Sequence, residues 1–313
     1  MAENKVPNKK AICDALVQAA KTDRDIVVLC SDSRGSASFG EFIEQYPDQL
    51  VEVGIAEQDL VGVSAGLARC GKKAFAVSPA CFLTTRSIEQ VKVDVCYSHT
   101  NVKLIGISGG ISYGALGMSH HSAQDVAYTA SLPGMRVYLP SDRFQSYWLV
   151  QQLLQDTEPA YLRVGRSAVE DLYDENTAFE LNRAKLVQDG TDLGIIACGE
   201  MVQQAAAAAR ILGEQGISCR VVDMYCLKPI DRAQVLETAR SVGALLTVEE
   251  HVRAGGLGSM VCQILCEEGI SLPVRCLTLP DEPVIAGNSA QVFAHYGLDG
   301  EGIARKGKEL VKE

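Results

Sequence analysis

The sequence predicts an α/β protein made of two consecutive, doubly wound domains whose sheets are mostly parallel. Short runs rich in β-branched residues alternate with amphipathic segments along most of the 313 residues. The strand runs are almost continuously apolar, which is typical of parallel strands covered by helices on both faces. The alternation stops once, in a polar and acidic stretch at 169–187. We therefore predict a first domain over 1–168, a linker over 169–187 and a second domain over 188–313.

In the first domain, predicted strands alternate with predicted helices. Buried runs such as DIVVLC predict strands at 25–30, 72–78, 102–108, 135–140 and 160–164. Apolar residues three and four positions apart predict helices near 9–22, 57–70, 84–97, 123–132 and 143–156.

The same alternation of strands and helices resumes after the linker. Apolar runs predict strands at 191–198, 218–225, 243–250 and 273–279. Amphipathic segments predict helices at 201–214, 231–241 and 256–268. The two domains thus share an architecture.

The charge balance excludes some partner classes. The chain carries 29 basic and 39 acidic residues, a net charge of −10, and a negative surface repels the phosphate backbone of nucleic acids. No apolar run approaches the roughly 18 residues that a membrane-spanning helix needs, and the chain begins without a secretory signal pattern. We expect a cytoplasmic protein that binds neither nucleic acid nor membranes.

Ligands of open parallel sheets bind beyond the carboxyl ends of the strands. Glu57 lies at such a point, in the run VGIAEQ at 53–58, where a helix is about to begin. A carboxylate there can offset the positive end of the helix dipole. It can also share a proton with a nitrogen atom of a bound ligand.

This run, followed by a helix of small residues, resembles the pyrimidine-binding domain of thiamine-diphosphate enzymes. It is most similar to transketolases and deoxyxylulose-phosphate synthases, in which this glutamate hydrogen-bonds the aminopyrimidine ring and activates the cofactor. The resemblance implies thiamine diphosphate as cofactor and Glu57 as a catalytic and cofactor-binding residue. It also implies a pyrimidine-binding domain followed by a transketolase C-terminal domain, whose E-E-H…G-G-L-G run is similar to 249–258.

The segment SPACFLTTRSIEQVK at 78–92 resembles the family stretch in which an aromatic residue precedes a helix with R-x-x-E-Q. Phe82 matches the phenylalanine that stacks on the aminopyrimidine, and a flat heteroaromatic ring gains from such stacking. Without the resemblance, Phe82 is equally a core residue. Arg86, one turn into the helix, is a candidate for substrate-anion binding or for the subunit interface, and otherwise a solvated arginine.

The glycine-rich loop at 108–121 contains two histidines, and a histidine can exchange protons near neutral pH. His120 matches the family histidine that contacts a substrate oxygen. The sequence assigns no role to His121. Leu116 and Ser108 stand where transketolases carry an aspartate and a histidine that read the sugar. We therefore expect an unusual anionic sugar, such as a sulfonated or a branched one.

Arg166, in PAYLRVGRS at 159–167, matches the arginine that holds substrate phosphate in this family. Guanidinium groups suit oxyanions because they can donate two parallel hydrogen bonds. Arg163 alternates with it along the strand end, with no assigned role. Ser36, in the Ser/Gly loop 31–38, is a further candidate substrate contact.

The family's diphosphate-binding domain has no counterpart here, because the G-D-G motif that binds its metal does not occur in the 313 residues. We expect no metal ligands in this chain. A separate N-terminal subunit should bind the diphosphate and Mg²⁺, or Ca²⁺, and the assembly should be a dimer of heterodimers.

The expected function is therefore that of a split transketolase, which moves a two-carbon ketol unit from a ketose phosphate or another anionic ketose to an aldose. Two alternatives remain at this point. One is the beta subunit of a 2-oxoacid dehydrogenase, which has the same division of domains. The other is a non-catalytic scaffold subunit that has kept the fold.

Overall fold

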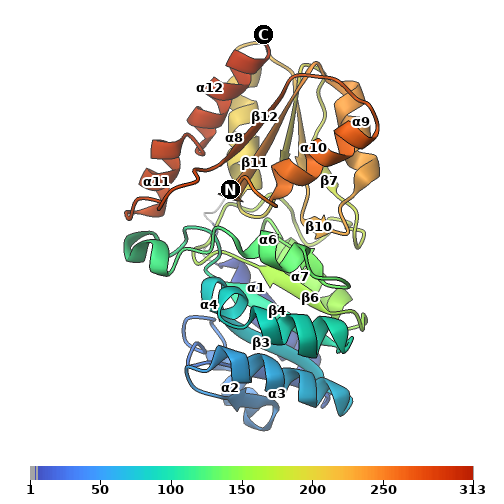
Figure 1. Cartoon of the computed structure of the whole chain (residues 1–313), viewed down its shortest axis with the longest axis vertical. Helices are drawn as coiled ribbons and strands as arrows, with labels where there is room; N and C mark the ends of the chain where they lie inside the picture. The colour runs from blue at the N-terminus through green and yellow to red at the C-terminus, as the bar shows by residue number, and fades with distance from the viewer. Residues whose placement is uncertain (1–3, 5, 313) are drawn as a thin grey trace.

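The computed structural model describes residue 4 and residues 6–312, so the outer ends of the two predicted domains lie outside the described residues. A seven-stranded sheet lies in the lower half of the molecule, where all its strands but β10 are coloured blue to green, and a five-stranded sheet forms the yellow-to-red half (Figure 1). Helices flank both sheets, and the α/β prediction is confirmed. Within the described ranges, no helix is long and apolar enough to cross a membrane.

The first sheet has the strand order β10-β5-β6-β4-β3-β1-β2. Its strands are β1 (Ile26–Cys30), β2 (Leu50–Glu52), β3 (Lys73–Pro79), β4 (Val102–Ile107), β5 (Arg136–Tyr138), β6 (Ala160–Arg163) and β10 (Cys226–Lys228). Every pairing is parallel except that of β10 with β5. The carboxyl ends of β1, β3, β4 and β6 therefore meet at one edge of the sheet.

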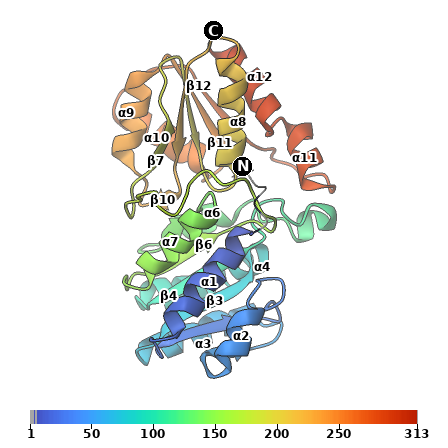
Figure 2. The same cartoon turned by 180° about the vertical axis from the view of Figure 1, so that it is seen from behind.

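Helices cover both faces of this sheet, and every residue of β1 and β4 is therefore buried. Alternate residues face opposite layers: Val28 packs in the cluster that contains α1 and α7, and Leu29 in the cluster that contains α3. Figures 1 and 2 show these layers from opposite sides. The helical segments are α1 (Asn8–Ala20), α2 (Gly40–Gln45), η1 (Pro47–Gln49), α3 (Glu57–Arg69), α4 (Ala80–Thr85), α5 (Ile88–Gln90), η2 (Val91–Tyr97), η3 (Gly114–Ser119), α6 (Asp125–Ala130) and α7 (Arg143–Leu153).

The second sheet has the order β12-β11-β8-β9-β7, with only β7 antiparallel. Its strands are β7 (Lys185–Gln188), β8 (Leu193–Ala197), β9 (Cys219–Asp223), β11 (Ala244–Val252) and β12 (Val274–Leu279). Its helices are α8 (Met201–Gly213), α9 (Arg232–Ser241), α10 (Leu257–Glu267), α11 (Ser289–Tyr296) and α12 (Gly300–Leu310).

The structure contains elements that periodicity did not predict. The strands β2, β7 and β10 have three or four residues, too few to establish a period. One of them, β7, begins inside the segment predicted as linker, and the domain limits themselves stay a prediction. Helix α12 contains three glycines, which disfavour helices in isolation. It forms because its buried face packs on α8 and β11.

The two halves share packing. Tyr225 and Cys226, from the second half of the sequence, are completely buried in the core of the first sheet. The Tyr225 ring lies 6.0 Å from that of Trp148 on α7 and stacks on Tyr138 at 6.3 Å between centroids. The first sheet is therefore complete only when the second half of the chain has folded.

We expect the two halves to unfold together in urea. Fluorescence of Trp148, which reports on α7, and far-UV circular dichroism, which reports on the whole chain, should give coincident transitions. Tyr225→Ala removes the shared aromatic contact and should lower the free energy of unfolding by about 3–5 kcal/mol. A fluorescence transition of the wild type that precedes the dichroism transition would contradict the shared core.

Candidate active site

The predicted site residues lie beyond the carboxyl edge of the first sheet, and most of them touch one after another. Nη1 of Arg86 donates to Oε2 of Glu57 at 2.6 Å, and the guanidinium lies over the ring of Phe82 with Cζ 4.4 Å from the centroid. The rings of Phe82 and His120 form a T-shaped pair with 5.3 Å between centroids. Three separate predictions, from 53–58, 78–92 and 108–121, thus converge on one place.

The line continues through a residue that the sequence analysis missed. The ring of Tyr113 lies 5.5 Å from that of His120 on one side, and Cζ of Arg166 lies 5.2 Å from the Tyr113 centroid on the other. Tyr113 therefore connects the predicted cofactor end of the site to the predicted anion end. The signal available in the sequence was an aromatic residue within a glycine-rich loop after a strand.

Glu57 is the first residue of α3, and its side chain is only 2% exposed. No side chain caps this helix, so the carboxylate lies near free N–H groups at the positive end of the dipole. The dipole interpretation and the ligand interpretation of Glu57 both fit this position.

The loop that carries His120 is held by short contacts. Nδ1 of His120 lies 2.9 Å from the Ser119 hydroxyl. His121 is buried, its Nε2 lies 3.1 Å from the Gly114 carbonyl oxygen, and burial lowers its pKa. His121 therefore supports the loop from inside. Leu116 is 53% exposed on the same loop, while Ser108 is buried at its start.

A cationic cluster forms the other end of the line. Nζ of Lys9 donates to the carbonyl oxygen of Ser36 at 2.6 Å. Burial lowers the pKa of Lys9, and the positive charge of Arg166 lowers it further. The two cations are therefore close enough to repel each other, which suits a place for an anion. Beside Arg166 opens a cavity of about 350 Å³ that α11 of the second sheet's half helps to line.

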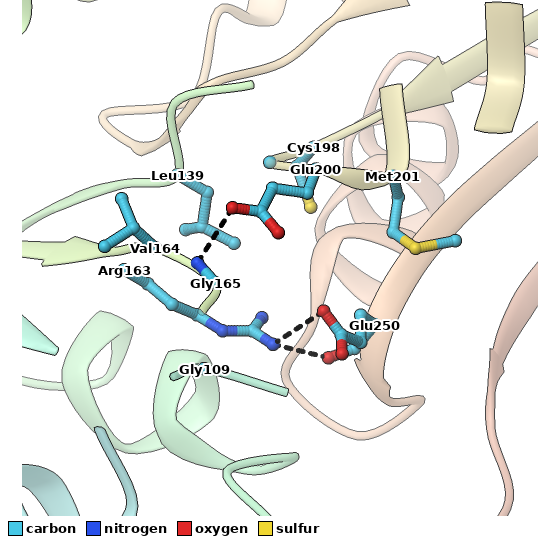
Figure 3. Close-up of a pocket in the computed structure, with 10 residues that line it drawn as sticks. Gly109, Leu139, Arg163, Val164, Gly165, Cys198, Glu200, Met201 and Glu250 are labelled. Atoms are coloured by element: carbon cyan, nitrogen blue, oxygen red, sulfur yellow. Dashed lines mark hydrogen bonds and ion pairs between the residues drawn. The ribbon is translucent and has the colours of Figure 1, made fainter. Parts of the chain in front are cut away.

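Arg163 is not at this surface. It is 5% exposed and lies between the two halves, with its Nε 3.4 Å from Oδ2 of Asp125 and its Nη2 3.6 Å from Oε2 of Glu250. Its Nη2 also donates to the Glu250 carbonyl oxygen at 2.8 Å, as Figure 3 shows. Burial raises the pKa of Glu250 to about 7 although the charge of Arg163 opposes the rise.

This buried pair positions the loop that leads to His120. Oε1 of Glu250 accepts a hydrogen bond from the backbone N–H of Ile111 at 2.6 Å. A Cβ atom at Gly109 would overlap Nε of Arg163, and one at Gly110 would overlap Cδ of Glu250. Gly110 also has a φ of +58°. Glycine is therefore required twice where the loop crosses the ion pair.

Glu200, which follows β8 in the second half of the chain, contacts the first half at a neighbouring point (Figure 3). Its Oε1 accepts hydrogen bonds from Gly165 N at 3.0 Å and Asn8 Nδ2 at 3.1 Å. Burial raises the pKa of Glu200 to about 8, and the charge of Glu250 adds to the rise. A small cavity of about 20 Å³ separates these groups. Sequence reasoning missed Glu200, because no local pattern indicates that a residue after a strand will accept hydrogen bonds from the other half of the chain.

The other two residues of the E-E-H run at 249–251 also make buried contacts. Glu249 accepts the N–H groups of Leu257 and Gly258 at 2.7 and 2.8 Å, which satisfies the start of α10. Nε2 of His251 accepts the N–H of Ala127 at 3.3 Å across the interface. Among the residues that the structure describes, no three His, Cys, Asp or Glu side chains form a group that could hold a metal ion.

Comparison with known proteins covers nearly the whole chain. Residues 4–171 match the family model described as the pyrimidine binding domain of transketolase, and residues 182–303 match that of the transketolase C-terminal domain. The chain is 50% identical to a subunit of apulose-4-phosphate transketolase from Phocaeicola vulgatus, over 100% of both chains. It is 35% identical to a subunit of 6-deoxy-6-sulfo-D-fructose transketolase from Clostridium sp. (strain MSTE9), covering 96% of this chain and 92% of that one.

A solved structure is similar over the same extent. It is described as "Split gene transketolase, inactive beta4 tetramer", with a TM-score of 0.88, 34% identity and 99% of both chains covered.

We expect Gly110→Ala to destabilise the protein by about 2 kcal/mol or more, because the methyl group meets a buried carboxylate and the residue is held at positive φ. Gly66→Ala is the matched control. A Cβ at Gly66, on α3, meets nothing within 4 Å, and alanine should stabilise the helix by about 0.5–1 kcal/mol. Urea unfolding measures both, and equal effects of the two substitutions would contradict the close approach.

The raised pKa of Glu200 makes stability depend on pH. A carboxyl group that is harder to ionise when folded favours the folded state while it is protonated, and this contribution is lost as pH rises from about 4.5 to about 8. Glu200→Gln stays neutral and keeps an acceptor for Gly165 and Asn8. Its free energy of unfolding should exceed that of the wild type by on the order of 1–3 kcal/mol more at pH 8.5 than at pH 5.

The matched control is Glu44→Gln, because Glu44 is exposed on α2. A substitution at an exposed position should change the free energy of unfolding by no more than about 0.5 kcal/mol. Parallel curves for wild type and Glu200→Gln would show that Glu200 ionises as readily in the folded protein as in the unfolded chain.

Proposed function

Because the chain belongs to the transketolase family, we propose that it is the pyrimidine-binding subunit of a two-subunit, thiamine-diphosphate-dependent transketolase. The observation that carries the proposal is the continuous line of contacts from Glu57 through Arg86, Phe82, His120 and Tyr113 to Arg166. One end of this line suits a planar nitrogen heterocycle, and the other end suits an anion.

The residues fit the aminopyrimidine, and the guanidinium of Arg86 supports this. A flat, nitrogen-rich cation already lies over the Phe82 ring and donates to the Glu57 carboxylate. An aminopyrimidine has a similar flat face and polar nitrogen edge. When bound, thiamine diphosphate supplies the thiazolium ring that stabilises negative charge on the transferred two-carbon unit. In this proposal, Glu57 holds a proton at the pyrimidine ring nitrogen and Phe82 holds the ring by stacking.

The substrate roles follow the rest of the line. We assign His120, which lies between the two ends, to proton transfer at substrate oxygens. We assign Arg166, supported by the nearby Lys9 and by the loop of Ser36, to the anionic end of the sugar. Arg86 is a further substrate contact in this assignment. Two similar proteins are named for a sugar phosphate and a sulfo sugar, which supports an anionic ketose as the substrate class.

A partner subunit completes the site. The names of two similar proteins specify a subunit, and the proposed site on this chain has no group suited to a hard cation within the described residues. We propose that a second chain binds the diphosphate through Mg²⁺ or Ca²⁺, and that two such pairs form a dimer of heterodimers. Exposed apolar side chains near the start of α3 and on η2, at Ile55 and Tyr97, suit such contacts.

The test is co-expression with a diphosphate-binding partner chain, followed by assays of ketol transfer from anionic ketoses. Glu57→Ala should lower kcat/KM by at least about 10²-fold, because a group that moves a proton typically contributes that much. Phe82→Ala should weaken cofactor binding about 3- to 10-fold through lost stacking. Arg166→Ala should chiefly raise KM for the anionic donor.

The control is Glu44→Ala, an exposed residue of α2 that takes no part in the line of contacts, and it should act as the wild type. A stable complex that neither binds thiamine diphosphate nor turns over any ketose would overturn the proposal and favour a scaffold subunit.

A further inference from the structure

Arg86 makes two contacts at once that a bound aminopyrimidine would also need. Its Cζ lies 4.4 Å from the centroid of the Phe82 ring, and its Nη1 lies 2.6 Å from Oε2 of Glu57. One face of the Phe82 ring and one oxygen of Glu57 are therefore occupied by the same guanidinium group. The two partners come from different segments, the start of α3 and the middle of α4.

A guanidinium and an aminopyrimidine make the same demands on such a site. Both are flat, both place a π-system or cation against an aromatic face, and both present nitrogen atoms to a carboxylate. Two flat groups cannot stack on the same face of one phenylalanine while bonded to the same carboxylate oxygen. Resting on the proposed function, we infer that Arg86 is an internal ligand of the pyrimidine site, and that the cofactor binds only when it displaces this guanidinium.

The contacts allow Arg86 to leave. Its side chain is 45% exposed, whereas that of Glu57 is 2% exposed. It follows the last residue of α4, at the C-cap position. Within the described part of the chain, Glu57 and Phe82 are the only partners found for the guanidinium. A change of rotamer therefore opens the site at the cost of only these two interactions among the hydrogen bonds, ion pairs and ring contacts of the described residues.

Displacement of Arg86 by the cofactor predicts whether removal of this arginine strengthens or weakens cofactor binding. An ion pair with one exposed partner and a single cation–π contact are each weak interactions, so displacement lowers cofactor affinity by a modest factor. Removing the arginine should then tighten binding. A purely structural arginine predicts the opposite, because its loss would leave the site less ordered and the Glu57 carboxylate without its partner.

The first experiment uses the assembled pair of subunits and measures the Kd of thiamine diphosphate at fixed Mg²⁺ by calorimetry. Arg86→Met should bind about 3- to 10-fold more tightly than the wild type. Arg86→Lys keeps the charge but loses the flat face, so its Kd should lie between the two. Arg69→Met, at the far end of α3, is the matched control and should leave the Kd unchanged.

The second experiment uses this chain alone with 4-amino-2-methylpyrimidine, a ring without the diphosphate. Saturation-transfer NMR should detect stronger contact with Arg86→Met than with the wild type, and the double variant Arg86→Met, Phe82→Ala should lose the signal. This measurement does not depend on turnover or on the partner. Urea unfolding of each variant confirms that the comparison is between folded proteins.

The outcomes separate this inference from the proposed function. Binding of thiamine diphosphate by the wild-type pair, with an equal or weaker affinity in Arg86→Met, would overturn the displacement of Arg86 and leave the function standing. No binding by any assembled form would overturn the function and, with it, this inference.

Discussion

The arrangement of the site depends on one buried guanidinium, that of Arg163. It lies between the two halves of the molecule with Asp125 on one side and Glu250 on the other. Burying charge is costly unless partners surround it, so the strand end, the start of α6 and the end of β11 must meet in one way. The second oxygen of Glu250 then fixes Ile111, and with it the beginning of the loop that carries Tyr113 and His120.

The parallel sheet supplies the second constraint. Because β1 to β6 run in one direction, the segments after β1, β3, β4 and β6 emerge at one edge, although they are far apart in sequence. Each brings one kind of group: the Ser36 loop, the Phe82 helix, the His120 loop and Arg166. Helix α3 adds Glu57 beside them. The second half of the chain completes this sheet, because it pairs β10 with β5 and adds Tyr225 to the first core. The second domain is therefore part of the support for the site.

The two ends of the line differ in how firmly they are built. At the pyrimidine end, Glu57 is buried and Arg86 bridges it to Phe82. At the anion end, Arg166 is exposed beside a cavity of about 350 Å³, and Leu116 is exposed on the neighbouring loop. The pyrimidine end is therefore occupied by paired side chains, whereas the anion end is open. The first is set by burial and pairing, and the second by side chains that can change without disturbing the core.

The sequence by itself determined the α/β class, most of the strands and the segments that carry Glu57, Phe82, His120 and Arg166, because burial on both faces and turns after strands leave local patterns. It did not predict the three short strands, the glycine-containing α12 or the roles of Arg163 and Glu250, and it missed Tyr113 and Glu200 altogether. These depend on contacts between residues as far apart as Ile111 and Glu250, which no local period records. Only the tertiary structure decided that Arg163, at the end of β6, forms ion pairs between the two halves of the molecule. It also decided that Arg86 bridges Glu57 and Phe82. Both facts depend on which segments meet in space.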